Sequence, residues 1–361
     1  MDIIKLTPAY KSIIWGGDKL KSLYGKNTEL SPLAESWELS FHEAGECTLA
    51  DGTPLSRAAS PEELGANIVG FDFFPVLVKF IDAKDKLSVQ VHPADDYALK
   101  HENSLGKTEM WYIADADEGA GIYLGFKENI SREEFERAIK EKTLTEYLKF
   151  IPVKKGDSYF IPAGTIHAIC SGCLICEIQQ NSNITYRVYD YGRKDKDGRE
   201  RELHIEKALA VTNTSPLQSR ELNVKTSEGV LKGISKFFTA TLVEIDGERE
   251  IFEDSASFRH YTCLDGEGSI GDVKICKGES VFVPAGQPKF TIQGKFAAIM
   301  TTVRKYFLKI EKSEIIKAAV IDDRGEIIKE ISAPARSMSE SEISESVLSA
   351  CGLTPSDISE K

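Results

Sequence analysis

The sequence predicts a mainly β protein, built from two related β-barrels with a small helical insertion and a C-terminal ββα unit. Three observations support this fold class. Short apolar segments rich in β-branched and aromatic residues recur along most of the chain, bounded by turn formers, as in barrels and sandwiches. One turn motif occurs twice. Helical spacing replaces strand alternation only in short stretches.

The densest set of predicted strands lies in the first 230 residues. It begins with FFPVLVKFIDA (73–83), KLSVQVHP (86–93) and EMWYIADA (109–116). After residue 153 it continues with SYFIPAG, TIHAIC, CLICEIQQ and ITYRVYDY. We expect these segments to form one β domain over residues 1–230.

A helical segment interrupts these strands at residues 131–150. Ser131 can cap a helix, and Glu134 follows three residues later, which is the spacing of a capping box. Apolar residues then recur at roughly helical spacing, from Phe135 to Leu148. We expect one helix or two short ones here, and a further helix that begins near His204.

The repeated motif marks a second barrel. KKGDSYFIPAGTIHAI (154–169) and CKGESVFVPAGQPKFTI (276–292) both read G-x5-P-x-G when Gly156 is aligned with Gly278. Three residues after the last glycine the first copy has His167, whereas the second has Lys289. We therefore expect a second domain over residues 231–310 that resembles the first but has lost a metal site.

Residues 311–361 have a different pattern, that of a ββα extension of unknown role. IIKAAVIDDRGEIIKEISAP (315–334) predicts a hairpin about Asp323-Arg324-Gly325. Ser339 and Glu342 form a capping box, and Gly352 ends the helix that follows. The unit has little core of its own, so it must pack on something else.

Bulk composition excludes several classes of function. The net charge is -12, from 45 basic and 57 acidic residues, which argues against a nucleic-acid partner. The N-terminal segment MDIIKLTPAYKSIIWGG lacks a long apolar stretch and a small-residue cleavage site, and no window approaches a membrane span. We expect a cytoplasmic protein with no membrane partner, in which the seven cysteines are reduced thiols.

Four residues with metal-binding side chains are spaced so that strands can bring them together. Strand alternation points Gln90 and His92 to the same side, which a barrel interior can enclose. Glu109 begins the next strong strand, and His167 follows the PAG turn. Two imidazoles, a carboxylate and an amide would form a zinc site with room for water or substrate. The same alternation places Lys107 beside Glu109.

Two other motifs are interpreted as structural. Residues 266–271 read G-x-G-x-x-G, but DVKICKGES follows as a strand, whereas a dinucleotide site requires a helix. We interpret this motif as a barrel turn. Cys170, Cys173 and Cys176 lack a second cysteine pair at zinc-finger spacing, so we interpret them as core residues.

The motif from Gly156 to His167 resembles the second signature of the cupins, whose fold is a jelly-roll β-barrel. Gln90-Val91-His92 stands where cupins generally carry H-x-H. Glutamine there is similar to the type I phosphomannose isomerases, as are several other segments of residues 1–308. These segments are Trp15-Gly16-Gly17, Glu35-Ser36-Trp37-Glu38, LSVQVHP, GKTEMWY (106–112), GTIHAI and NITYRVYDYGR.

The resemblance implies a zinc-dependent aldose–ketose isomerase that interconverts mannose 6-phosphate and fructose 6-phosphate through a cis-enediol. It implies one Zn²⁺ per chain, held by His92, Glu109 and His167 with Gln90 as a further ligand. It also implies that Arg187 is the active-site arginine and that Lys107 binds substrate. The general base is not assigned. The expected partner is a phosphosugar, and the expected assembly is a monomer or homodimer.

Two alternatives remain open at this point. Two histidines and a carboxylate are also the ligands of non-haem iron oxygenases, so a cupin oxygenase would use the same residues. A non-catalytic sugar-binding cupin is the other alternative. The chain retains every expected ligand position in the first barrel, which favours an enzyme over a binding protein.

Overall fold

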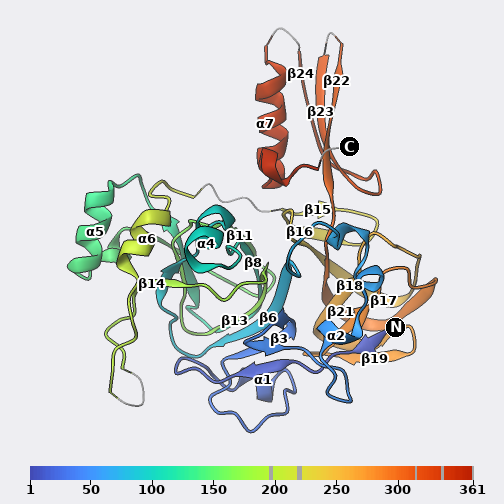
Figure 1. The fold of residues 1–361 in the computed structure, drawn as a ribbon, viewed down its shortest axis with the longest axis horizontal. Coiled ribbons are helices and arrows are strands. Elements are labelled where there is room, and N and C mark those ends of the chain that lie inside the picture. Colours follow the sequence, from blue (N-terminus) through green and yellow to red (C-terminus); the bar gives the residue numbers. More distant parts are fainter. Residues whose placement is uncertain (195–197, 218–221, 314, 335–336, 360–361) are drawn as a thin grey trace. The chain divides into compact units, whose positions relative to one another are not determined.

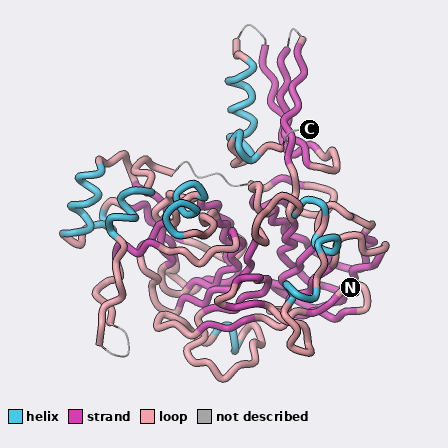
Figure 2. Tube along the Cα trace, viewed as in Figure 1, coloured by secondary structure: helices cyan, strands magenta, loops and turns pink. Residues whose placement is uncertain are grey.

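Strands dominate the structure, a computed structural model that describes residues 1–194, 198–217, 222–313, 315–334 and 337–359 (Figures 1 and 2). The prediction of a mainly β fold is confirmed. The chain forms two compact units, one of residues 8–46 and 77–219, the other of residues 1–7, 47–76 and 220–361. The division at residues 230 and 310 that the sequence suggested stays a prediction.

The first barrel, in the unit of residues 8–46 and 77–219, consists of two sheets. One has the order β11-β8-β13-β6-β3-β2 and the other β10-β9-β12-β7-β14. The first six strands are β11 (Ser158–Ile161), β8 (Glu109–Ala116), β13 (Cys173–Gln180), β6 (Val76–Ala83), β3 (Glu35–Leu39) and β2 (Ala9–Lys11). The other five are β10 (Leu148–Pro152), β9 (Gly121–Phe126), β12 (His167–Ile169), β7 (Val89–Val91) and β14 (Tyr186–Tyr189).

The core of this barrel lies between its two sheets. Trp111 and Ile175 from one sheet pack with Ile122 and Ile169 from the other. These apolar residues alternate along their strands with side chains of the opposite face, which is why a two-sheet sandwich can form from short strands.

Helices cover the outer face of the β7-containing sheet. α5 (Arg132–Lys140) has the capping box of Ser131 and Glu134 that the sequence indicated, and α6 (Ile205–Val211) starts after His204. Phe135 and Ala208 pack against Val89 and Val91 of β7. The predicted helical segment is shorter than 131–150, because Leu148–Pro152 pairs with β9 as strand β10.

The remaining helices and short strands of this unit lie around the two sheets. They are α1 (Lys19–Ser22), α4 (Asp95–Glu102), the 3-10 helix η2 (Leu144–Glu146), β4 (Phe41–His42) and β5 (Gly45–Glu46). Strands β4 and β5 pair as a short hairpin.

The second barrel belongs to the other unit and contains an eight-stranded sheet. Its order is β1-β20-β18-β21-β17-β16-β15, with β19 paired to β18. The strands are β1 (Ile4–Lys5), β15 (Val224–Lys225), β16 (Val230–Ile234), β17 (Thr239–Ile251), β18 (Arg259–Ile270), β19 (Val273–Cys276), β20 (Ser280–Val283) and β21 (Phe290–Thr302). Three short helices complete it, α2 (Leu55–Ala58), α3 (Pro61–Leu64) and η1 (Ala66–Ile68).

A row of glycines crosses this sheet and accounts for the glycine-rich motif. Gly247, Gly294 and Gly268 are register partners on β17, β21 and β18. A Cβ on Gly294 would lie 2.5 Å from the Gly268 Cα, so only glycine permits this approach of the strands. Most of the G-x-G-x-x-G motif therefore lies within β18, and the turn itself is at Gly271. This differs in detail from the expected turn, but the motif is structural.

The C-terminal segment contains the predicted hairpin and helix, together with one additional strand. β23 (Ile315–Asp322) and β24 (Ile327–Pro334) form the hairpin, and β22 (Tyr306–Lys312) pairs with β23. α7 (Glu340–Cys351) has its predicted capping box and ends at Gly352 in the left-handed conformation. A short η3 (Pro355–Asp357) follows.

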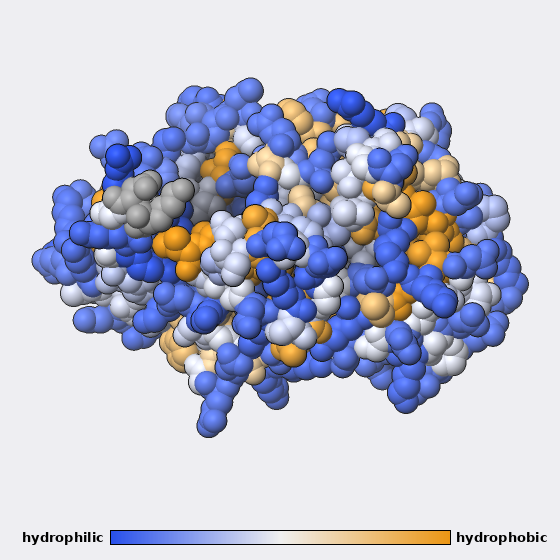
Figure 3. Space-filling view, turned by 90° about the horizontal axis from the view of Figure 1, so that it is seen from below, coloured by the Kyte–Doolittle hydropathy of each residue, from blue (hydrophilic) through white to orange (hydrophobic). Residues whose placement is uncertain are grey.

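The face of the molecule drawn in Figure 3 is mostly hydrophilic, with apolar residues in separate groups. No helix among the described residues is long and apolar enough to cross a membrane.

Candidate metal centre

Three side chains meet inside the first barrel. His92 follows β7, Glu109 begins β8 and His167 begins β12, and all three are fully buried. His92 Nε2 lies 3.7 Å from one Glu109 carboxylate oxygen, and His167 Nε2 lies 3.4 Å from the other. Of the residues that the structure describes, this is the one group of three or more histidines, cysteines or carboxylates arranged to hold a metal ion.

Backbone carbonyls fix how the two imidazoles are protonated. His92 Nδ1 lies 2.7 Å from the Ile184 carbonyl oxygen, and His167 Nδ1 lies 2.9 Å from that of Thr165. A carbonyl can only accept a hydrogen bond, so each Nδ1 carries the proton and each Nε2 keeps its lone pair. Burial, aided by the Lys107 charge, lowers the pKa of His92 well below its usual range and that of His167 to about 4. Both rings are therefore neutral near pH 7, as metal ligands must be.

The geometry of this group fits a zinc ion. Ligand atoms about 2.1 Å from a tetrahedral zinc lie about 3.4 Å from one another, close to the separations between Glu109 and the two imidazoles. The buried Glu109 Oε1 accepts no hydrogen bond from any described residue, so it needs another partner. The role of these residues as metal ligands stays a prediction.

Gln90 lies beside the same group. Its amide nitrogen is 3.4 Å from His167 Nε2, and Ser88 donates a hydrogen bond of 3.3 Å to its amide oxygen. Because amide nitrogen and oxygen exchange places when the group is turned, the amide can also present its oxygen to an ion. The position is compatible with a fourth ligand.

Lys107 lies at the centre of a buried charge cluster. Its ammonium donates to Glu109 at 2.5 Å and to Glu177 at 3.2 Å, and lies 3.2 Å from His92 Nε2. Lys79 also pairs with Glu177, at 3.2 Å. Burial raises the pKa of Glu177, but the two lysines outweigh it and lower that pKa to about 2. Burial and the Glu177 charge together raise the pKa of Glu109 to about 7.

Sequence reasoning missed Glu177 and Lys79. Each is a charged residue inside an otherwise apolar strand, in CLICEIQQ and FFPVLVKFIDA, and that anomaly was the available signal. Trp111 donates to Glu177 at 2.8 Å and contacts the His167 ring edge-on. The cluster therefore extends the predicted site by two charged residues from neighbouring strands.

Arg187 lies on β14 directly opposite Gln90 of β7. One terminal nitrogen donates to the Glu202 carbonyl at 2.9 Å, whereas its buried Nε has no partner among the described residues. Burial and the neighbouring Arg201 lower the pKa of Arg187, which remains charged near pH 7. Arg187 thus lies on the strand beside Gln90, and its guanidinium retains a donor that a ligand could use.

Two glutamines hold the loop that carries the Ile184 carbonyl. The buried Gln179 amide donates to the carbonyls of Gln180 and Ser182, at 2.7 and 2.6 Å. Gln180 accepts from the Thr108 backbone at 2.7 Å, next to Glu109. The loop that orients His92 is therefore tied to the strand that carries Glu109, another feature the sequence did not indicate.

The second barrel repeats this framework with other residues at the site. All four motif glycines have positive φ, at Gly156, Gly164, Gly278 and Gly286. The Gly164 amide donates to the His92 carbonyl, and the Gly286 amide donates to that of Asp254. Asp254 is thus the counterpart of His92.

Strand register extends the correspondence. Ile161 pairs with Glu109 in the first barrel, and Val283, five residues after Gly278, pairs with Arg259 in the second. Arg259 is therefore the counterpart of Glu109. The same register makes Met300 the counterpart of Glu177. Glu177 is opposite Trp111, two residues after Glu109, and Met300 is opposite Tyr261, two residues after Arg259.

The predicted loss of the metal site agrees with these counterparts. Lys289, three residues after Gly286, is about half exposed and pairs with Glu250. Arg259 and Lys289 introduce positive charge at the positions that Glu109 and His167 have in the first barrel. A divalent cation would be repelled there.

Two family models match the chain. One is phosphomannose isomerase type I, catalytic domain, over residues 3–121, and the other is mannose-6-phosphate isomerase, cupin domain, over residues 231–303. The second match coincides with the second barrel.

Relatives match over nearly their whole length. A mannose-6-phosphate isomerase of Streptococcus mutans is 39% identical over 75% of this chain and 89% of its own. The mannose-6-phosphate isomerase ManA of Bacillus subtilis is 33% identical over 81% of this chain and 96% of its own. A crystal structure of a mannose 6-phosphate isomerase from Bacillus subtilis superposes with a TM-score of 0.78, at 35% identity, over 83% of this chain and 99% of that one.

Proposed function

The chain belongs to the type I phosphomannose isomerase family, and we propose that it interconverts mannose 6-phosphate and fructose 6-phosphate with one zinc ion held in the first barrel. The predicted enzyme class, mannose-6-phosphate isomerase, is confirmed by the family models and the relatives. The zinc ion, the cis-enediol route and the roles of individual residues are the parts proposed here.

The observation that carries the proposal is the buried group of His92, Glu109 and His167. Both histidines direct a neutral Nε2 toward one carboxylate, and the separations match those of zinc ligands. Gln90, whose amide lies 3.4 Å from His167 Nε2, would be the fourth ligand. When bound, zinc would act as a Lewis acid that stabilises negative charge on a sugar oxygen.

The reaction itself needs no outside oxidant or reductant. A base removes the proton from C2 of the aldose while O1 gains a proton, which gives a cis-enediol. Loss of the O2 proton and protonation of C1 then give the ketose. The protein must therefore hold a proton near C1 and C2 and stabilise charge on O1 and O2.

Charged residues of this chain are positioned for those tasks. Lys107 contacts both Glu109 and Glu177, so it can bind a substrate oxygen and exchange a proton within the cluster. Arg187 can use its planar guanidinium to hold the phosphate or the enediolate oxygens. We assign Arg187 a catalytic role and Lys107 a substrate-binding role, and leave the base unassigned between Lys107 and the two carboxylates.

A coupled assay of fructose 6-phosphate formed from mannose 6-phosphate tests the proposal. Arg187→Ala should keep the fold and the metal but lose most turnover. Arg137→Ala, an exposed arginine on helix α5, is the matched control and should leave turnover unchanged. Normal turnover by Arg187→Ala would contradict its assignment. No activity in metal-replete protein, or oxygen consumption with iron, would contradict the isomerase and favour the oxygenase.

A further inference from the structure

The C-terminal segment, residues 306–359, needs its own explanation. The family models end at residue 303, and the Bacillus subtilis structure is matched over 99% of its length by only 83% of this chain. The described part of this segment packs on the second barrel through two kinds of contact, one apolar and one ionic.

The apolar contact joins the segment to strand β16 and its surroundings. Ile316, Val320 and Val347 of the segment cluster with Leu231 and Ile234 of the barrel. Burial of such side chains supplies most of the free energy of docking. Because the hydrophobic effect is non-directional, this burial specifies the position of the segment less sharply than pairing of charges does.

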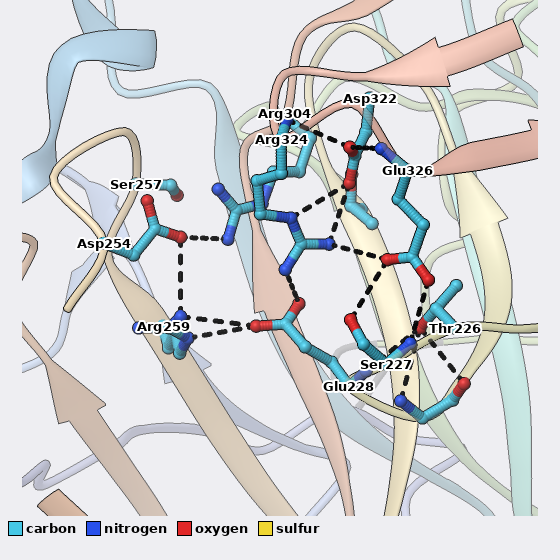
Figure 4. A network of polar contacts seen from close by, with 12 residues as sticks. Thr226, Ser227, Glu228, Asp254, Ser257, Arg259, Arg304, Asp322, Arg324 and Glu326 are labelled. Atoms are coloured by element: carbon cyan, nitrogen blue, oxygen red, sulfur yellow. Dashed lines mark hydrogen bonds and ion pairs between the residues drawn. The ribbon is translucent and has the colours of Figure 1, made fainter. Parts of the chain in front are cut away.

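The ionic contact is specific to one position of the C-terminal segment on the barrel. It includes Arg259 and Asp254, the counterparts of Glu109 and His92 (Figure 4). Arg259, the counterpart of Glu109, pairs with Glu228 at 3.3 Å and with Asp254, the counterpart of His92, at 3.5 Å. From these two carboxylates two branches of alternating charge extend into the C-terminal segment.

The first branch passes through Glu228. Arg324, in the turn between β23 and β24, pairs with Glu228 at 2.5 Å and with Asp322 at 2.8 Å. The same Asp322 accepts hydrogen bonds from the backbone of Arg324 and Glu326. These bonds stabilise the turn that positions Arg324. Removal of Arg324 would take the cation away from the buried Asp322 and would leave Glu228 paired with Arg259 alone.

The second branch passes through Asp254. Arg304, which is only 1% exposed, pairs with Asp254 and lies 3.6 Å from Asp323 of the turn. Asn67 donates a hydrogen bond to the other oxygen of Asp323. Both branches therefore end on the turn Asp322–Arg324.

We propose that the second barrel has converted the position of its metal site into a docking site whose ligand is this turn of its own chain. Arg259 and Asp254 anchor the network, and the turn supplies the complementary charges. Buried ion pairs contribute little net stability but penalise every mispaired arrangement. The network thus holds the C-terminal segment at one position on the second barrel. The apolar cluster supplies most of the free energy that keeps the segment bound there.

Hydrogen–deuterium exchange of the full-length protein tests this proposal. Arg324→Met should raise the exchange of β23, β24 and α7 at least about tenfold, because the segment opens locally while both barrels stay folded. Isomerase turnover should stay unchanged, since no residue of the metal group is altered. Lys309→Met, which removes an exposed pair with Glu311 on the same sheet, is the matched control and should not change exchange.

A second, milder variant tests the same network in case Arg324→Met does not fold. Asp323→Asn keeps the size of the side chain and removes only the charge beside Arg304, so it should give a smaller increase in the same segments. Exchange equal to the unmodified protein in both variants would overturn the proposal. An equal increase in Lys309→Met would also overturn it, because the effect would then belong to the sheet and not to the network.

Discussion

The two barrels share their turns and strand register but place different charges at corresponding positions. The first has His92 and Glu109 where the second has Asp254 and Arg259, and His167 where the second has Lys289. In the first, neutral imidazoles face a carboxylate that lacks a full set of partners. In the second, arginines satisfy the carboxylates. The shared scaffold places the corresponding side chains alike, and their charges make one position suited to a cation and the other to a network of ion pairs.

The largest expected effect comes from removing the charge that distinguishes the first barrel. Glu109→Gln should lower turnover by at least about 100-fold and abolish stoichiometric metal binding, because the carboxylate is the one anionic ligand proposed. Elemental analysis and the coupled assay measure both. Glu250→Gln, at the exposed partner of Lys289, is the control in the second barrel. Full metal content in Glu109→Gln would contradict the ligand assignment.

The next largest effect is expected at Glu177, whose counterpart in the second barrel is the uncharged Met300. Glu177→Gln keeps the shape but deprives Lys107 and Lys79 of their shared anion. We expect turnover to fall about 100-fold, as for loss of a group that supports proton transfer, while metal content stays the same. A loss of metal in parallel with activity would show instead that Glu177 acts through the ligands.

A smaller effect is expected from the loop that orients His92. Gln179→Met removes the two hydrogen bonds to the carbonyls of Gln180 and Ser182. Groups behind a metal ligand typically contribute 10-fold to 100-fold in affinity, so we expect about a tenfold weaker metal affinity. Titration with a competing chelator measures it. Gln293→Met, an exposed site on β21, should have no effect.

The smallest effect is expected in the second barrel. Lys289→His restores the histidine of the repeat, yet it should not create a second metal site, because Arg259 remains next to Asp254. Stability should change by less than about 0.5 kcal/mol, since the Lys289–Glu250 pair is exposed. A second bound ion in this variant would show that the buried arginines are not what excludes the metal.

Local and long-range features differed in how well the sequence predicted them. The capping boxes at Ser131 and Ser339 are both present, because three-residue spacing determines them. The repeat and strand alternation also placed His92, Glu109 and His167 within reach of one another. Such features depend on residues close in sequence or on a repeated motif.

Contacts between distant strands could not be predicted in the same way. Glu177 meets Lys79 and Lys107 only because β13, β6 and β8 belong to one sheet. The network around Arg324 likewise joins Glu228, about a hundred positions earlier, to the C-terminal turn. The alternation of apolar and polar residues along a strand predicts to which face of the sheet a side chain points. It does not predict which side chain lies next to it on the neighbouring strand.

The zinc centre of the first barrel is tested most directly by the metal stoichiometry of the unmodified protein, measured together with its isomerase activity. We predict one zinc ion per chain, loss of fructose 6-phosphate formation when a chelator removes it, and recovery when zinc is restored. Two ions per chain would contradict the distinction between the barrels. Undiminished activity after complete removal of metal would contradict the proposed centre itself.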